Sequence, residues 1–105
     1  MKTPDYSGTW EAFDEDSRAV FEIGRDAGNY AVSAYDKIDG EKFRVTNIRV
    51  EQGSLQFETY VRSTRHRAKH KLTLLRNGRM VQELTLIEYW KRVRKSRISD
   101  PAAPV

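Results

Sequence analysis

The chain has 105 residues, of which 38% are hydrophobic and 32% charged, and its formal net charge is +4. This length allows one domain with a modest core and excludes a second domain. The chain has no cysteine, which excludes disulfides, thiolate zinc sites and thiol nucleophiles and is typical of a reducing compartment. It also lacks the roughly 20 apolar residues of a membrane span and a secretory leader, so we expect a cytoplasmic protein that does not insert into membranes.

The basic charge is concentrated in the second half of the chain. Residues 1–58 carry 7 basic and 12 acidic side chains, whereas residues 59–105 carry 12 basic and 3 acidic ones. Two segments, 62–71 and 91–97, each contain five lysines or arginines. Such clusters attract phosphate-bearing partners, although a solvated strand face has the same composition. After a single domain over 1–97, residues 98–105 contain two prolines and no periodicity, which predicts a flexible C-terminal tail.

Short runs of alternating apolar and polar residues, separated by turn signals, cover most of the chain. This pattern predicts an antiparallel meander with one buried face. We expect strands at 8–14, 18–24, 29–36, 42–51, 54–62, 66–76 and 79–91. A competing interpretation makes residues 64–76 a helix, with Ser63 or Thr64 as its cap and Gly78 just past its end.

Turn chemistry predicts how the middle strands pair. A turn at Gln52–Gly53 places Val50 opposite Leu55, and the change of phase within strand 42–51 requires a β-bulge near 46–47. A two-residue turn at 64–65 would place Thr59 opposite His70.

The last hairpin requires a three-residue loop at 76–78, with Gly78 in the left-handed region, because a two-residue loop would mix the two faces. This loop sets Lys71 beside Glu83 on the outer face. On the inner face it gives the pairs Leu74–Met80, Leu72–Gln82, His70–Leu84, Ala68–Leu86 and His66–Glu88.

These strands predict an all-β domain, an up-and-down antiparallel meander of about seven to eight strands that forms a small barrel or a highly curved sheet. The first strand opens with Gly8-Thr9-Trp10, and the last reads Leu86-Ile87-Glu88-Tyr89-Trp90-Lys91-Arg92. These two ends resemble the calycin pattern of lipocalins and fatty-acid-binding proteins. The resemblance implies that Trp10 packs across the closed end against Arg92, or against Lys91 or Arg94, and that the barrel binds a small apolar molecule.

The chain also departs from that pattern. Only a tight turn fits at residues 14–17, so the helical lid of fatty-acid-binding proteins is absent, as are the disulfide and flanking helix of typical lipocalins. The barrel would therefore be short, with a small cavity or one filled by its own side chains.

A polar cluster on the inner face is the candidate ligand site. Buried polar groups need partners, and a carboxylate facing an imidazole could recognise the polar end of a ligand. Hydrogen-bonded pairs at an open rim would have the same composition. The residues of this cluster are His66, His70, Glu88, Thr59 and Gln82.

Other chemistries have little support. Four residues along a strand span roughly 13 Å, too far for His66 and His70 to share a metal ion, and only the helical alternative would bring them together. We find no nucleophile elbow and no phosphate-binding loop, so we expect a non-enzymatic protein with neither metal nor cofactor. A weak hydrolase or isomerase acting through Glu88 and His66 is kept as a further alternative.

The sequence thus favours a small-ligand-binding module, with a second function left open. On the outer face a basic stripe runs beside Tyr60, and such a stripe could bind nucleic acid or an acidic protein. An open edge between the first and last strands would also let two copies pair. The stripe consists of Arg62, Arg67, Lys69 and Lys71.

Overall fold

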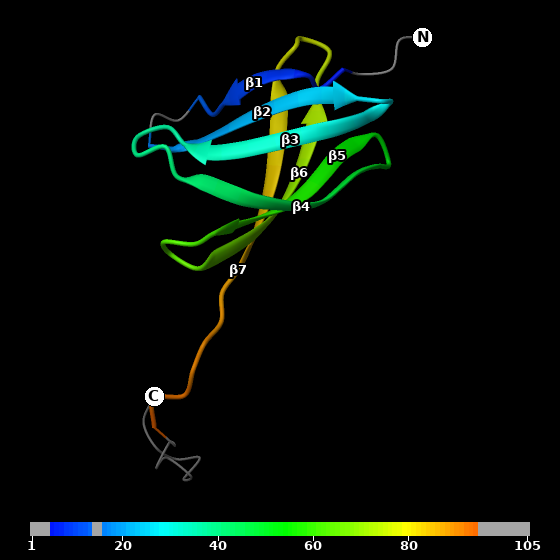
Figure 1. Ribbon diagram of the computed structural model, residues 1–105. Helices are drawn as coiled ribbons and strands as arrows, with labels where there is room; N and C mark the ends of the chain where they lie inside the picture. The colour runs from blue at the N-terminus through cyan, green and yellow to red at the C-terminus, as the bar shows by residue number, and fades with distance from the viewer. Residues whose placement is uncertain (1–4, 14–15, 95–105) are drawn as a thin grey trace.

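The computed structural model describes residues 5–13 and 16–94. It is a seven-stranded antiparallel sheet in which the strands follow one another in chain order, and the sheet curls into an open half-barrel (Figure 1). The predicted all-β meander, a highly curved sheet, is confirmed. The strands are β1 (Gly8–Glu11), β2 (Ala19–Asp26), β3 (Asn29–Asp36), β4 (Lys42–Glu51), β5 (Ser54–Val61), β6 (His66–Leu74) and β7 (Met80–Ile87).

The expected tail at 98–105, and residues 95–97 of the second basic segment, lie outside the described residues. Between residues 5–13 and 16–94, no helix is long and apolar enough to cross a membrane.

Tight turns set the pairing of two hairpins. Ala27 and Gly28 have φ of 50° and 86°, and Gln52 and Gly53 have φ of 51° and 78°. Two successive residues with positive φ form the turn whose twist matches that of paired strands. The second turn places Val50 opposite Leu55, as the sequence predicts.

The last hairpin also follows the prediction. Gly78 has φ of 83°, and the Leu75 N–H donates to the Arg79 carbonyl at 2.7 Å, which closes a loop over residues 76–78. The expected pairs from Leu74–Met80 to Ala68–Leu86 form, and Lys71 lies 3.7 Å from Glu83 on the outer face.

A bulge in β4 shifts the alternation of inward and outward side chains along that strand. The register against β5 shifts between Thr46 and Arg49, at the position the sequence predicts. Asn47 adopts φ of 58° there, and its side chain donates to Glu58 at 2.9 Å. Asparagine tolerates this left-handed conformation better than most residues, which is why the bulge falls on it.

The predicted strand at 66–76 is confirmed as β6, and the helical alternative over 64–76 is incorrect. One expectation about β6 is wrong, its register against β5. The β5–β6 register is two residues from the expected one, with Thr59 opposite Ala68 and Phe57 opposite His70. The reason is the loop, which spans four residues, 62–65, and ends on Arg65 at φ of 59°. A shift of two residues preserves the inner face while it changes every cross-strand neighbour.

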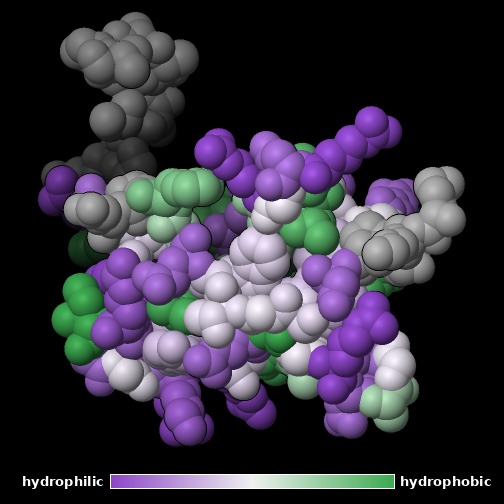
Figure 2. All heavy atoms as spheres, turned by 90° about the horizontal axis from the view of Figure 1, so that it is seen from above, coloured by the Kyte–Doolittle hydropathy of each residue, from purple (hydrophilic) through white to green (hydrophobic). Residues whose placement is uncertain are grey.

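The core lies inside the curl of the sheet. Phe21 of β2 and Phe57 of β5 meet edge to face, with ring centroids 5.2 Å apart, and Leu55 and Leu72 are fully buried beside them. Tyr6, from the segment before β1, crosses one end of the curl, where its hydroxyl donates to the Gly53 carbonyl at 2.9 Å. Outside the curl, long hydrophilic side chains project into solvent, with hydrophobic groups visible between them (Figure 2).

The hairpin glycine gives a test of this fold. We expect Gly78→Ala to lower the free energy of unfolding by about 1–2 kcal/mol, because only glycine adopts its left-handed φ without strain. A Cβ at this position meets no atom within 4 Å, so the loss would be conformational and not steric. Urea titration of the variant measures it.

Gly24→Ala is the matched control, since Gly24 has an ordinary φ in β2 and equally open space around it. We expect this variant to be neutral or slightly stabilised. Equal losses in both variants would contradict the loop geometry.

Candidate functional site

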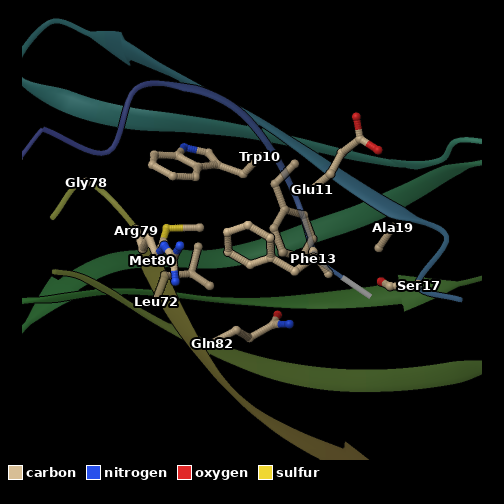
Figure 3. Close-up of a pocket in the computed structure, with 12 residues that line it drawn as sticks. Trp10, Glu11, Phe13, Ser17, Ala19, Leu72, Gly78, Arg79, Met80 and Gln82 are labelled. Carbon is tan, nitrogen blue, oxygen red and sulfur yellow. The ribbon is translucent and has the colours of Figure 1, made fainter. Parts of the chain in front are cut away.

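A cavity of about 310 Å³ lies where the sheet fails to close, between β1 and the start of β7. Trp10 lies on one side of it and Gln82 on the opposite side, with Met80 and Leu72 on one flank (Figure 3). Phe13, from the segment after β1, and Phe21, from β2, complete an apolar lining. The cavity therefore draws its walls from both ends of the chain.

A polar network lies beneath this cavity, in the apolar interior. His70 of β6 is buried, with its ring stacked on Phe57 at 4.9 Å between centroids and edge-on to Phe21 at 5.2 Å. Its Nε2 lies 2.7 Å from the Thr59 hydroxyl and its Nδ1 lies 2.6 Å from Gln82 Oε1. Three of the five predicted ligand-site residues thus come together.

Burial keeps this imidazole neutral. It lowers the pKa of His70 below the ordinary value, and the hydrogen bond with Gln82 only partly opposes the effect. A neutral ring has a single N–H, and because Gln82 Oε1 can only accept, we assign that proton to Nδ1. Nε2 then accepts from the Thr59 hydroxyl, so both ring nitrogens are satisfied.

Gln82 connects the network to the cavity. Gln82 is itself exposed; its carbonyl oxygen is engaged by His70, and its amide nitrogen forms no hydrogen bond with the described residues. Because the side chain lines the cavity, this NH₂ group can donate to a hydrogen-bond acceptor placed there. The site thus offers one polar group oriented by the interior on a mostly apolar wall, whose other polar residues are Glu11, Ser17 and Arg79.

The remaining two predicted residues lie elsewhere. His66, at the start of β6, and Glu88, just after β7, are exposed and line a shallow depression with Tyr89 and Trp90. No hydrogen bond or ion pair joins His66 to Glu88 in the described residues. The expected pairing fails because β7 ends at Ile87, before it reaches the position opposite His66.

The expected contact between Trp10 and Arg92 is also absent from the described residues. The Trp10 indole N–H donates to the Tyr6 carbonyl at 2.8 Å, and its ring lines the cavity near Met80, where β7 begins. Arg92 is exposed beyond the other end of β7. Because β7 runs away from β1 (Figure 1), the first and last strands do not bring these two side chains together.

The basic stripe forms on the outer face of β6, where part of its charge is neutralised. The Arg67 guanidinium lies over the Tyr60 ring at 5.2 Å, and its Nε is buried without a hydrogen-bond partner among the described residues. Lys69 lies opposite Glu58, and Lys71 lies near Glu83. Arg62 is exposed in the loop after β5.

Sequence reasoning missed most of the cavity wall. Phe13, Arg79 and Met80 carry no motif, and they meet only because the half-barrel stops short of closure. The alternation of apolar residues places Met80 on the inner face, but it does not reveal that no described strand pairs with the outer edge of β7. In the described ranges, no three metal-ligating side chains form a cluster.

Comparisons with protein-family models, with curated proteins and with solved structures found no match.

The buried histidine makes stability depend on pH. Its folded-state pKa is lower than the unfolded value near 6.5, so the unfolded chain binds the proton first as the pH falls. We expect the free energy of unfolding, measured by urea titration, to decrease between pH 7.5 and 5.5, by at most about 1.4 kcal/mol per pH unit. The pKa values of Asp5 and Asp36 are also lowered, but these groups change the free energy of unfolding only below about pH 4, outside this range.

His70→Gln should remove this pH dependence, whereas His66→Gln, at an exposed position, should retain it. The assignment is wrong if the His70 variant keeps the wild-type slope.

Proposed function

We propose that this protein is a non-enzymatic module that binds a small, mostly apolar molecule in the cavity between β1 and β7. The observation that carries the proposal is the free amide group of Gln82, which lines a mostly apolar cavity of about 310 Å³. Small-molecule sites typically combine such a hydrophobic lining with a few placed polar groups.

The lining indicates the chemistry of the ligand. Trp10 and Phe13 present aromatic surface, and Met80 supplies an adaptable thioether, which together suit a flat or ring-containing molecule. Gln82 donates a hydrogen bond, so the ligand needs one acceptor, such as a carbonyl or carboxylate oxygen. Arg79 lies at the mouth with its guanidinium 5.0 Å from the Phe13 ring, where it would favour an anionic group.

The network argues against acid–base catalysis by His70. This residue lies behind Gln82 and does not line the cavity, and both of its ring nitrogens are occupied, one by Thr59 and one by Gln82. A general base needs a nitrogen within reach of the substrate proton. His70 therefore orients Gln82 and holds it in one rotamer.

Gln82→Leu tests the polar contact. We expect native mass spectrometry of gently purified wild-type protein to show a small bound mass that is lost on denaturation. The variant has nearly the same volume but lacks the donor, and we expect its affinity for that molecule to fall by about tenfold or more, since a ligand acceptor would be buried unpaired.

Gln56→Leu is the control, because it makes the same change on the outer face of β5, where Gln56 contacts Arg49 and not the cavity. Circular dichroism confirms that each variant is folded. Equal retention of the bound mass by all three proteins, or a wild type without one, would argue against the site.

The basic outer face supports a second candidate function, binding of single-stranded nucleic acid. It is favoured by one observation, the guanidinium of Arg67 over the ring of the half-buried Tyr60, with Lys69 next to Arg67 on the same face. Aromatic and basic groups in this arrangement bind bases and phosphates together.

The dependence of binding affinity on salt concentration distinguishes the two candidate functions. If the basic face binds nucleic acid, affinity for a fluorescent oligothymidylate falls steeply between about 50 and 200 mM salt, and Lys69→Ala makes that dependence shallower. Capture in the apolar cavity should change little over the same range. An affinity for the oligonucleotide that ignores salt would exclude the basic face.

A further inference from the structure

In the part of the chain that the structure describes, no strand pairs with the outer edge of β7, and from Leu84 onward this edge lies outside the proposed cavity. Leu84 and Leu86 belong to the inner face, yet they are 49% and 61% exposed, because nothing in the described part of the chain lies beside them. Tyr89 and Trp90, which follow β7, are 78% and 89% exposed. Exposed apolar groups of this size along one strand mark an association surface.

The backbone of this edge is free to pair. Arg79 directs its carbonyl to Leu75, the residue after β6, and successive residues of a strand direct their N–H and C=O groups to opposite sides. Gln82, Leu84 and Leu86 therefore direct these groups away from β6, toward the open edge. From Met80 to Ile87 the strand contains neither the proline nor the lysine that commonly blocks such edges.

Two copies of the β7 sequence match each other when they are paired antiparallel and centred on Thr85. When two copies of β7 run antiparallel with Thr85 on the two-fold axis, three of the opposed pairs are apolar and a fourth sets two polar residues against each other, whereas Glu83 meets Ile87. The opposed pairs are Leu84–Leu86, Gln82–Glu88, Val81–Tyr89, Met80–Trp90 and Glu83–Ile87.

Neighbouring registers fit less well. An axis at Glu83 sets that carboxylate against its own copy, and an axis at Leu84 creates two mismatched pairs, Met80–Glu88 and Gln82–Leu86, where the axis at Thr85 has one. An unrelated partner strand would not require the edge to match itself. We propose that two copies of this chain form a homodimer by antiparallel pairing of β7 with β7, with the two-fold axis at Thr85.

Oligomeric state is the first test. Sedimentation of the full-length wild type should show a dimer whose population rises with protein concentration. Leu84→Lys should weaken dimerisation by at least about tenfold, because a lysine would be buried against Leu86 of the partner subunit. Leu75→Lys, at a loop position that is 41% exposed, should leave it unchanged.

Cysteine cross-linking tests the register, and the chain has no cysteine of its own to interfere. In the proposed dimer the two Thr85 Cα atoms form a non-hydrogen-bonded pair about 4.5 Å apart, within disulfide range. Thr85→Cys should therefore form a covalent dimer on mild oxidation, whereas Leu84→Cys and Glu83→Cys should not.

All three positions are exposed, so these substitutions are compatible with the fold. A wild type that stays monomeric at every concentration would overturn the proposal. So would preferential cross-linking at Leu84→Cys or Glu83→Cys.

Discussion

The half-barrel stays open because its first strand is short. Among the described strands, β1 has four residues and pairs only with β2, whereas β7 has eight residues and pairs only with β6. Near Met80 the gap is spanned by side chains, with Trp10 and Phe13 across the cavity. Farther along, at Leu84 and Leu86, the inner face of β7 has no cover from the described residues. The cavity and the free edge are therefore two consequences of one short strand.

The short first strand leaves the sheet open, whereas the polar network ties its strands together. The network joins strands that the core alone would leave less constrained. An imidazole between two phenyl rings is costly to bury unless both of its nitrogens find partners. Thr59 comes from β5 and Gln82 from β7, so these two hydrogen bonds join the strands on either side of His70 through its ring. Since Gln82 also lines the cavity, the orientation of its amide toward a ligand is set from inside the protein.

Local sequence predicted the faces of the strands better than the contacts between them. Alternation identified the inner residues, and glycine located the turns at Gly53 and Gly78, where the register is as expected. The loop over 62–65 contains no glycine, and there the expected register is two residues off. His70 still reaches Thr59, because the two side chains lie diagonally on the same face. The pairing of His66 with Glu88 depended on where β7 ends, and no residue type marks that position.

The cavity and the edge use different parts of the same strand. Gln82 reaches the cavity through its side chain, while its N–H and C=O groups point along the sheet toward the edge. Leu84 and Leu86 lie one and two inner-face positions farther along and do not line the cavity. A change of side chain at Leu84 therefore leaves the cavity wall intact, and a change at Gln82 leaves the edge backbone able to pair. Because of this separation, dimerisation can be measured in Leu84 variants with the cavity wall unchanged.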